Sequence, residues 1–456
     1  MRYDARLYRP SDYNIIIPLC SGMIIYNGMG DMLQKLSATE QAIYELLVAG
    51  KTTAELLDVA DNERNLSKIM EKFLQGRFIL PKKSDEKVLF NKALKLLKNR
   101  TDSFGLTIAP TLACNFVCDY CFQGEHRVEA QMDIGVQNRL MDFIEERLEG
   151  KKYFSVAWYG GEPLLALGVI EELSKRIIEL CKQKNCEYRA SIVTNGYLLT
   201  ESAARKLIKC RVDSVQITLD GDKCSHDSRR YIVGNIPTFD KIIANLMQII
   251  NLKELYFNIR VNIDKRNYND IDGLLYYLQA CGLSDKNNLS VYFAPVDICT
   301  EECLKISDEV LSAESYSRLE TKLLEKSLRM KLCKASLPAR IFSLCGAVLQ
   351  NSFVILPNGD VHKCWNTVAE NSQKVGNIDD PKAILVNSLY NSWVHRPMIK
   401  NDACYSCPIL ANCAGGCAAK DGFNGSSCIS LRNNVRRRLI MYALDRQIID
   451  ESEIVE

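Results

Sequence analysis

The chain has 456 residues, with 58 basic and 56 acidic side chains, 19 cysteines and only four histidines. At about 150 residues per domain, this length predicts roughly three domains. The net charge of +2 gives no general attraction to nucleic acid or to an anionic membrane, so we expect neither as a partner. A metal site would have to be built mainly from sulfur, which favours zinc, copper(I) or iron–sulfur clusters.

The odd number of cysteines predicts free thiols rather than a disulfide framework. The first residues are polar, and no apolar run reaches the roughly 18 residues that cross a bilayer. We therefore expect a cytoplasmic protein in a reducing environment.

Residues 1–82 predict a small winged-helix-like module. Two strand patterns at 14–19 and 23–26 are separated by a hairpin turn. Ser37 and Glu40 form a capping box that opens a helix over 38–49. A second helical pattern over 66–74 and a strand at 77–80 complete the module.

Residues 83–104 predict a basic helix and linker, because seven basic and two acidic side chains fall between positions 82 and 100. Two interpretations of this charge stay open. It is either a solvated helix face or a surface that docks an acidic peptide.

Residues 105–310 predict an α/β fold with a parallel sheet, because short apolar strands alternate regularly with helical patterns. Right-handed crossovers would curl the sheet into a partial (β/α)6 barrel with its functional loops at the carboxyl ends of the strands. The six predicted strands lie at 106–111, 154–159, 188–194, 214–219, 255–263 and 289–295.

Residues 311–456 predict a bridging segment and a cysteine-rich iron–sulfur domain, because the alternation stops and cysteines cluster in loop-like sequence. A helical pattern over 430–449 closes the chain.

Three cysteines, Cys114, Cys118 and Cys121, directly follow the first predicted strand. Three thiolates can hold an iron–sulfur cluster and leave one iron open to an exogenous ligand. Zinc, with His126 as a weak fourth ligand, and an inert buried set of thiols are the alternatives.

Two turn motifs follow the next two strands, and each alone would be an ordinary structural turn. They are Gly160-Gly161-Glu162-Pro163 and Thr194-Asn195-Gly196. Because both end at the same rim, their glycines would allow close backbone approach to a ligand. Glu162 and Asn195 would offer polar groups to a ligand's ammonium and hydroxyls.

This combination resembles the radical S-adenosylmethionine enzymes. The resemblance implies that Cys114, Cys118 and Cys121 are catalytic and hold a 4Fe-4S cluster, whose open iron chelates the amino and carboxylate groups of S-adenosylmethionine. A 5′-deoxyadenosyl radical would then remove hydrogen from an unactivated carbon. The implied cofactor-binding residues are Tyr120 and Phe122 near adenine, Gly160, Gly161, Glu162 and Pro163 near the amino group, Thr194 and Asn195 on the rim, and Thr218, Asp220 and Arg230 near the ribose and carboxylate.

Seven downstream cysteines resemble the SPASM extension, which carries two auxiliary 4Fe-4S clusters; a zinc ribbon is the alternative for the 404–417 set alone. The resemblance implies one cluster on Cys404, Cys407, Cys413 and Cys428, and another on Cys345, Cys364 and Cys417. The second cluster would take Cys333, Cys299 or Cys303 as its fourth ligand, or leave the position vacant for a substrate thiolate.

The expected function follows from two further features. Trp365 stands where the sulfatase-maturating branch has an acidic base, which argues against that branch, and the N-terminal module resembles a leader-recognition element. We therefore predict a maturase of a ribosomally made, leader-bearing peptide that forms a cysteine thioether, as in sactipeptides and ranthipeptides. Carbon–carbon or carbon–oxygen crosslinking and epimerisation of the peptide are the enzymatic alternatives. An iron–sulfur electron-transfer protein or a zinc-bound scaffold is the non-enzymatic alternative. We expect a monomer that takes electrons from a flavodoxin or ferredoxin.

Overall fold

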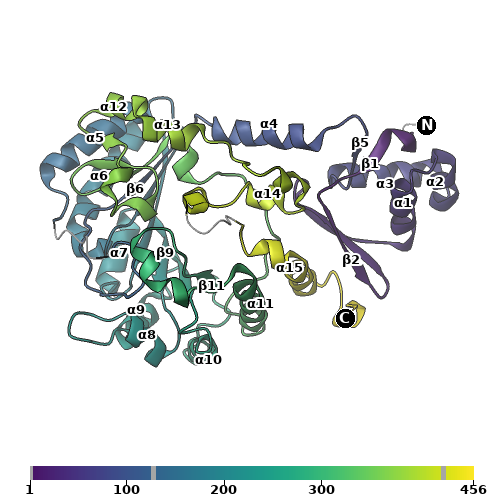
Figure 1. Cartoon of the computed structure of the whole chain (residues 1–456). Coiled ribbons are helices and arrows are strands. Elements are labelled where there is room, and N and C mark those ends of the chain that lie inside the picture. The colour runs from purple at the N-terminus through teal and green to yellow at the C-terminus, as the bar shows by residue number, and fades with distance from the viewer. Residues whose placement is uncertain (1–3, 125–129, 423–427, 456) are drawn as a thin grey trace.

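The computed structural model describes residues 4–124, 130–422 and 428–455. Figure 1 shows an N-terminal module at one end, an α/β region at the other, and C-terminal segments between them. Helix α4 (Glu86–Lys98) runs from the module to the α/β region.

The N-terminal module contains five strands and three helices. Strands β2, β3 and β4 form one antiparallel sheet, and β1 pairs with β5 in another. The predicted hairpin, helix and capping box are present, with Ser37 and Glu40 each accepting the other's backbone N–H. The sequence did not predict β1, β4 or α2, although Thr52 and Glu55 form a second capping box that marks α2. The elements are β1 (Tyr8–Pro10), β2 (Asn14–Leu19), β3 (Gly22–Asn27), β4 (Met32–Leu36), α1 (Ala38–Val48), α2 (Thr53–Ala60), α3 (Glu63–Gln75) and β5 (Ile79–Pro81).

Both faces of the three-stranded sheet are covered. Ile25 and Leu36 pack in one cluster with α1 to α3. Ile24 and Tyr26 pack in another with the terminal helix α15 (Leu431–Asp445). The last described residues return to the same hairpin, where the Cys20 N–H donates to the Glu453 carbonyl at 2.9 Å.

The α/β region has all six predicted strands, arranged side by side and parallel. Helices follow the strands, as expected for repeated β–α units. The fold is thus mixed α/β with a parallel sheet. The strands are β6 (Ser103–Ile108), β7 (Tyr153–Trp158), β8 (Glu187–Thr194), β9 (Val212–Thr218), β10 (Tyr256–Ile263) and β11 (Leu289–Pro295); the helices are α5 (Ile134–Leu148), α6 (Leu167–Gln183), α7 (Glu201–Lys209), α8 (Lys223–Arg229), α9 (Phe239–Ile249) and α10 (Ile271–Ala280).

Three strands from the cysteine-rich region extend this sheet, which the sequence did not predict. Strand β12 (Ser352–Ile355) pairs in parallel with β6, and β13 (Asp360–His362) and β14 (Gly376–Asn377) follow it. Phe353 is buried in the core of the α/β region, with its ring 5.7 Å from that of Phe143. The apolar β12 is therefore buried as part of the same core.

The strands of the sheet have one apolar and one polar face. On β6, Leu106 and Ile108 are buried in the core, whereas Thr107 is partly exposed. On β10, Ile259 is buried, whereas Arg260 is partly exposed. The polar face, turned away from the core, is the one that can accommodate a substrate.

The remaining elements are the helices of the C-terminal region and the 3-10 helices found along the whole described chain. The helices of the C-terminal region are α11 (Ala313–Arg329), α12 (Pro381–Val386), α13 (Ser388–His395), α14 (Leu410–Cys413) and α15. Short 3-10 helices lie at Ala5–Leu7, Pro163–Ala166, Glu302–Glu309, Gly346–Val348, Trp365–Thr367, Asn371–Gln373, Asp402–Ser406, Ala418–Gly422 and Glu451–Glu453. Among the helices described, none combines the length and apolar character needed to cross a bilayer.

Candidate active site

The cysteine loop leaves the carboxyl end of β6 and gathers its three thiols. Cys114 and Cys121 both lie close enough to Cys118 to act on its charge. Burial raises the pKa of the Cys118 thiol to about 12. The loop is held by the Val117 N–H, which donates to the Tyr231 carbonyl at 2.8 Å.

These thiols suit a cluster in donor type and number. Within residues 4–124, 130–422 and 428–455, no three His, Cys, Asp or Glu side chains are gathered tightly enough for a single metal ion. A 4Fe-4S cluster binds each thiolate through a different iron, so its ligands lie further apart than those of one ion. His126, the zinc ligand considered above, lies outside the described residues.

A buried polar network holds the loop against β9 and β10. The Tyr120 hydroxyl contacts Asp220 and accepts a hydrogen bond from Arg230 Nη1 at 2.5 Å. Asp220 Oδ1 accepts the backbone N–H of Asn262 at 3.0 Å. Tyr120 and Asp220, which are separated by 100 residues, therefore come together beside the cysteine loop, and their contacts with the cofactor stay predictions.

Arg230 brings a positive charge to the cysteine loop. Its guanidinium acts on Cys118 and opposes the effect of burial on the pKa of that thiol. Arg230 is buried, and its Nε has no hydrogen-bond partner among the described residues. A buried donor without a partner is costly, and a ligand carboxylate at this point would satisfy it. Arg230 thus fits the predicted contact with the carboxylate of S-adenosylmethionine.

The neighbouring Arg229 has a different role. It forms a buried ion pair with Asp264 at 2.8 Å and lies 5.0 Å over the Tyr120 ring. Arg266 also binds Asp264 and reaches Asp119 in the cysteine loop. These ion pairs connect the cysteine loop to Asp264 at the end of β10. The sequence analysis did not single out Asp264 or Arg266.

Glu162 joins the ends of β7 and β8. Its fully buried carboxylate accepts hydrogen bonds from Thr194 Oγ1 at 2.7 Å, the Asn195 N–H at 2.7 Å and the Leu164 N–H at 3.0 Å. Burial raises the pKa of Glu162 against these three donors. This bracing accounts for its position, and its contact with the ligand's ammonium group stays a prediction.

The glycines of this motif make room for the cysteine loop. A Cβ on Gly160, whose φ is +127°, would lie 2.2 Å from the Thr111 carbonyl oxygen. A Cβ on Gly161 would lie 2.1 Å from the carbonyl oxygen of Ala113. The close approach expected for a ligand is thus made by protein backbone, and Pro163 begins the 3-10 helix that follows.

The other predicted contacts lie around the same loop. Asn195 Nδ2 donates to Asn115 Oδ1 at 2.8 Å. Thr218 is buried at the end of β9. Phe122 packs between Leu112 on one side and the pair Cys299 and Cys303 on the other.

The structure gathers the seven downstream cysteines into the two predicted groups. Cys404 lies near Cys407 and Cys428, and so does Cys413. Arg432 Nη1 donates to the Cys428 sulfur at 3.1 Å. The second group is formed by Cys345, Cys364 and Cys417, whose thiols are near one another.

A left-handed turn separates two consecutive cysteines into different groups. Ala414, Gly415 and Gly416 have φ values of +47°, +92° and +80°. A Cβ on Gly415 would lie 2.1 Å from the Met398 carbonyl oxygen. The small residues between Cys413 and Cys417 therefore allow the chain to reverse, so that each cysteine serves its own group.

The candidates for a fourth ligand to the second group differ in position. Cys333 lies beside Asp445 of α15. The Cys299 thiol donates a hydrogen bond to Cys303 and has Cys364 as a further neighbour. This bond, with the Thr300 hydroxyl 3.3 Å from the Cys303 sulfur, lowers the pKa of Cys303 to about 6 despite burial. The two thiols are thus engaged with each other.

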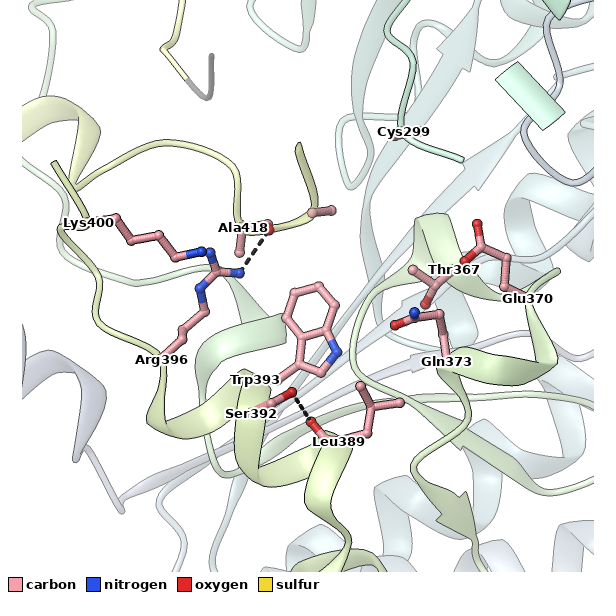
Figure 2. A pocket seen from close by; sticks show the side chains of 11 residues that line it. Cys299, Thr367, Glu370, Gln373, Leu389, Ser392, Trp393, Arg396, Lys400 and Ala418 are labelled. Carbon is pink, nitrogen blue, oxygen red and sulfur yellow. Dashed lines mark hydrogen bonds between the residues drawn. The ribbon is translucent and has the colours of Figure 1, made fainter. Parts of the chain in front are cut away.

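A cavity of about 360 Å³ is lined by Cys299 and by Trp393, which packs in one cluster with Cys364 of the second group. In Figure 2, Cys299 lies above, Thr367 and Glu370 lie on one side, and Arg396 and Lys400 lie on the other. The residues that line the cavity are Cys299, Thr367, Glu370, Gln373, Leu389, Ser392, Trp393, Arg396, Lys400, Ala418 and Ala419. The sequence analysis did not single out Glu370, because an acidic residue in a loop carries no distinctive signal.

Residues 108–275 match the sequence model of the Radical SAM superfamily. The match includes the cysteine loop, the two turn motifs and Arg230. The chain carries a radical SAM domain. Its resemblance to the maturases of this superfamily extends well beyond the matched residues, as the relatives show.

Curated relatives cover most of the chain. The cysteine-type anaerobic sulfatase-maturating enzyme of Clostridium perfringens (strain 13 / Type A) is 24% identical over 330 residues, which are 67% of this chain and 85% of that enzyme. The mycofactocin maturase MftC of Mycolicibacterium smegmatis is 24% identical over 336 residues, or 70% of this chain and 79% of that protein.

Solved structures share the fold. The structure of anSMEcpe with bound AdoMet and a peptide has a TM-score of 0.60 at 22% identity and covers 76% of this chain and 98% of that one. Streptococcus suis SuiB bound to its precursor peptide SuiA has a TM-score of 0.52 at 17% identity and covers 93% of this chain and 98% of that one.

Proposed function

We propose that this protein is a peptide maturase that uses S-adenosylmethionine to form a thioether between a cysteine of its substrate and an unactivated carbon of another residue. The observation that carries the proposal is the grouping of the cysteines. Cys114, Cys118 and Cys121 form one group beside Arg230, whose Nε has no partner among the described residues. Cys345, Cys364 and Cys417 form a separate group. Relatives named as maturases and as bound to a peptide support the substrate class.

The 4Fe-4S cluster and S-adenosylmethionine, when bound, supply a carbon-centred radical that removes hydrogen. The residues of this chain orient the cofactor. Arg230 would bind its carboxylate, since its buried Nε is available, while Tyr120 and Asp220 hold the Arg230 side chain in place. Asn195, on the adjacent strand end, would contact a cofactor hydroxyl.

The downstream groups would hold two auxiliary 4Fe-4S clusters. Cys404, Cys407, Cys413 and Cys428 supply four thiols. Cys345, Cys364 and Cys417 supply three, so one ligand position would be left for the thiolate of the peptide's cysteine. In this proposal Cys299 and Cys303 stay paired with each other rather than filling that position.

Recognition of the peptide would begin outside the α/β region. The N-terminal module would bind a leader segment by adding it as a strand at a sheet edge, where main-chain hydrogen bonds give affinity. Strand β4 is an edge of the three-stranded sheet. A flavodoxin or ferredoxin would supply the electrons, and the enzyme would act as a monomer in the cytoplasm.

Oxidation of a substrate cysteine to formylglycine is a second candidate. Trp365 is exposed and offers no carboxylate after Cys364. Glu370, however, brings a carboxyl group to the cavity from five positions further along the chain. This observation, with the sulfatase-maturating relatives, favours the second candidate more than the sequence alone does.

Mass spectrometry of a cysteine-containing precursor peptide, incubated with the reduced enzyme and S-adenosylmethionine, distinguishes these outcomes. Thioether formation removes two hydrogen atoms and makes the cysteine resistant to iodoacetamide. Formylglycine formation also removes two hydrogen atoms, but it replaces the cysteine sulfur by oxygen. A peptide that loses two hydrogens while its cysteine stays alkylatable would instead indicate a carbon–carbon or carbon–oxygen crosslink, and an unchanged mass with an inverted residue would indicate epimerisation.

A further inference from the structure

Among the described residues, no basic side chain acts on the carboxyl group of Glu370. One of its oxygens, Oε1, is buried and has no hydrogen-bond partner within the part of the chain that the structure describes. The groups that act most strongly on its charge are both acidic, namely Glu301 and Cys303. Burial and these neighbours raise the pKa of Glu370. A carboxyl group placed in this way gains stability by accepting a proton or a donor from elsewhere.

The cavity beside Glu370 adjoins the three-thiol group. Trp393 packs directly on Cys364, and Ala418 and Ala419 pack around them. Trp393, Ala418 and Ala419 also line the cavity. Arg396, on the same wall, acts on the charges of Cys417 and Cys345.

The opposite wall adjoins the radical-generating loop. Cys299 lines the cavity, and it packs with Phe122, which directly follows Cys121. An occupant of the cavity would therefore lie between the two sites that the proposed reaction must bring together. A volume of about 360 Å³ suits one or two amino-acid side chains with their backbone.

We propose that this cavity binds the reacting cysteine of the peptide and that Glu370 is the base that takes up its thiol proton. The S–H bond breaks, the proton passes to a carboxylate oxygen of Glu370, and both electrons stay on sulfur. The resulting thiolate is the form that binds iron. This inference rests on the proposed function, and it holds for both candidates because each starts from a substrate cysteine.

The charged and titratable groups around Glu370 define the controls. Glu301 and Cys303 face it, and Arg396 and Lys400 lie across the cavity. Glu301 does not line the cavity, so Glu301→Gln removes a nearby negative charge while leaving the proposed base intact. Glu370→Gln keeps the size of the side chain and removes the base.

Calorimetric counting of protons tests the proposal without requiring turnover. The probe is the tripeptide N-acetyl-Gly-Cys-Gly-amide, titrated at pH 7.0 into the iron-loaded enzyme in two buffers of different ionisation enthalpy. At this pH the free thiol, with a pKa of about 8.5, is protonated. Binding to iron without a local base would release about one proton to the buffer.

The wild type and Glu301→Gln should bind the tripeptide with almost no proton released, because Glu370 retains it. Glu370→Gln should release about one proton per bound peptide or bind at least tenfold more weakly. The serine analogue should show no difference between the variants. Equal proton release by the wild type and Glu370→Gln, or no binding by the wild type, would overturn the proposal. If the wild type retains the proton and Glu370→Gln releases it, but no thioether is formed on a precursor peptide, only the proposed function would be contradicted.

Discussion

The radical-generating loop and the auxiliary cysteine region hold their thiols in different ways. Around the first, Tyr120, Asp220 and Arg230 connect the loop to β9 and β10 through buried hydrogen bonds. Around the second, most of the cysteines lie on or beside short 3-10 helices and a left-handed turn. The protein itself therefore fixes the first site, whereas in the proposed function the second would depend on its bound clusters for order.

Removal of iron should affect the stability of these two regions very differently. Chelation in the reduced state should leave the sheet from β7 to β10 protected in amide hydrogen exchange, because its apolar core needs no metal. Residues 396–422 should lose most of their protection, since metal binding energy is folding energy there. Equal protection of both regions before and after chelation would contradict the account.

The Cys404→Ala variant separates the two regions chemically. It should lose one auxiliary cluster, lowering the iron content from about twelve to about eight atoms per chain. The cleavage of S-adenosylmethionine to 5′-deoxyadenosine should continue, while modification of the peptide should stop. Iron analysis with both product assays checks this, and a variant that also loses 5′-deoxyadenosine would show that the sites are not independent.

The Arg230→Lys variant tests whether the Arg230 guanidinium at the first site binds S-adenosylmethionine. Lysine keeps the charge but cannot present the guanidinium Nε, so the KM for S-adenosylmethionine should rise about tenfold. Arg266→Lys is the matched control, because Arg266 binds Asp264 and Asp119 at the edge of the network. The same rise in both variants would make the effect structural rather than a loss of cofactor binding.

His226 gives the smallest expected effect. Burial, with Arg230 and Arg229 nearby, holds the pKa of this histidine well below its usual value. The unfolded chain therefore binds the proton first, and stability is lost as the pH falls below about 6.5, by about 1 kcal/mol per unit. Urea unfolding at pH 7 and pH 5.5 should show a smaller difference for His226→Asn than for the wild type. If the free energy of unfolding changes equally between the two pH values in both proteins, His226 does not cause the loss of stability at low pH.

The sequence predicted the elements with strong periodicity and the residues with distinctive chemistry. All six parallel strands were found, because buried strands between amphipathic helices leave a clear pattern. The clustered cysteines were singled out because thiols at these spacings are rare, and their roles as cluster ligands stay predictions. Strand β12 was missed because four residues are too short for a period to be seen, and its pairing with β6 spans more than 240 residues.

The sequence did not predict the individual contacts of the site residues, because these contacts depend on how distant chain segments pack together. Gly160 and Gly161 approach the cysteine loop, and Glu162 braces two strand ends. Glu370 reaches the cavity only because β13 and the following turns carry it there. Such roles follow from which chain segments meet in space.

In the proposed function, Cys114, Cys118 and Cys121 hold a cluster with one iron open to S-adenosylmethionine. The most direct measurement is the yield of 5′-deoxyadenosine from reduced, iron-loaded protein, for the wild type and for Cys118→Ala. We expect the wild type to form 5′-deoxyadenosine and the variant to form none above background. Absence of the product from the wild type, or equal yields from both proteins, would contradict the proposed function.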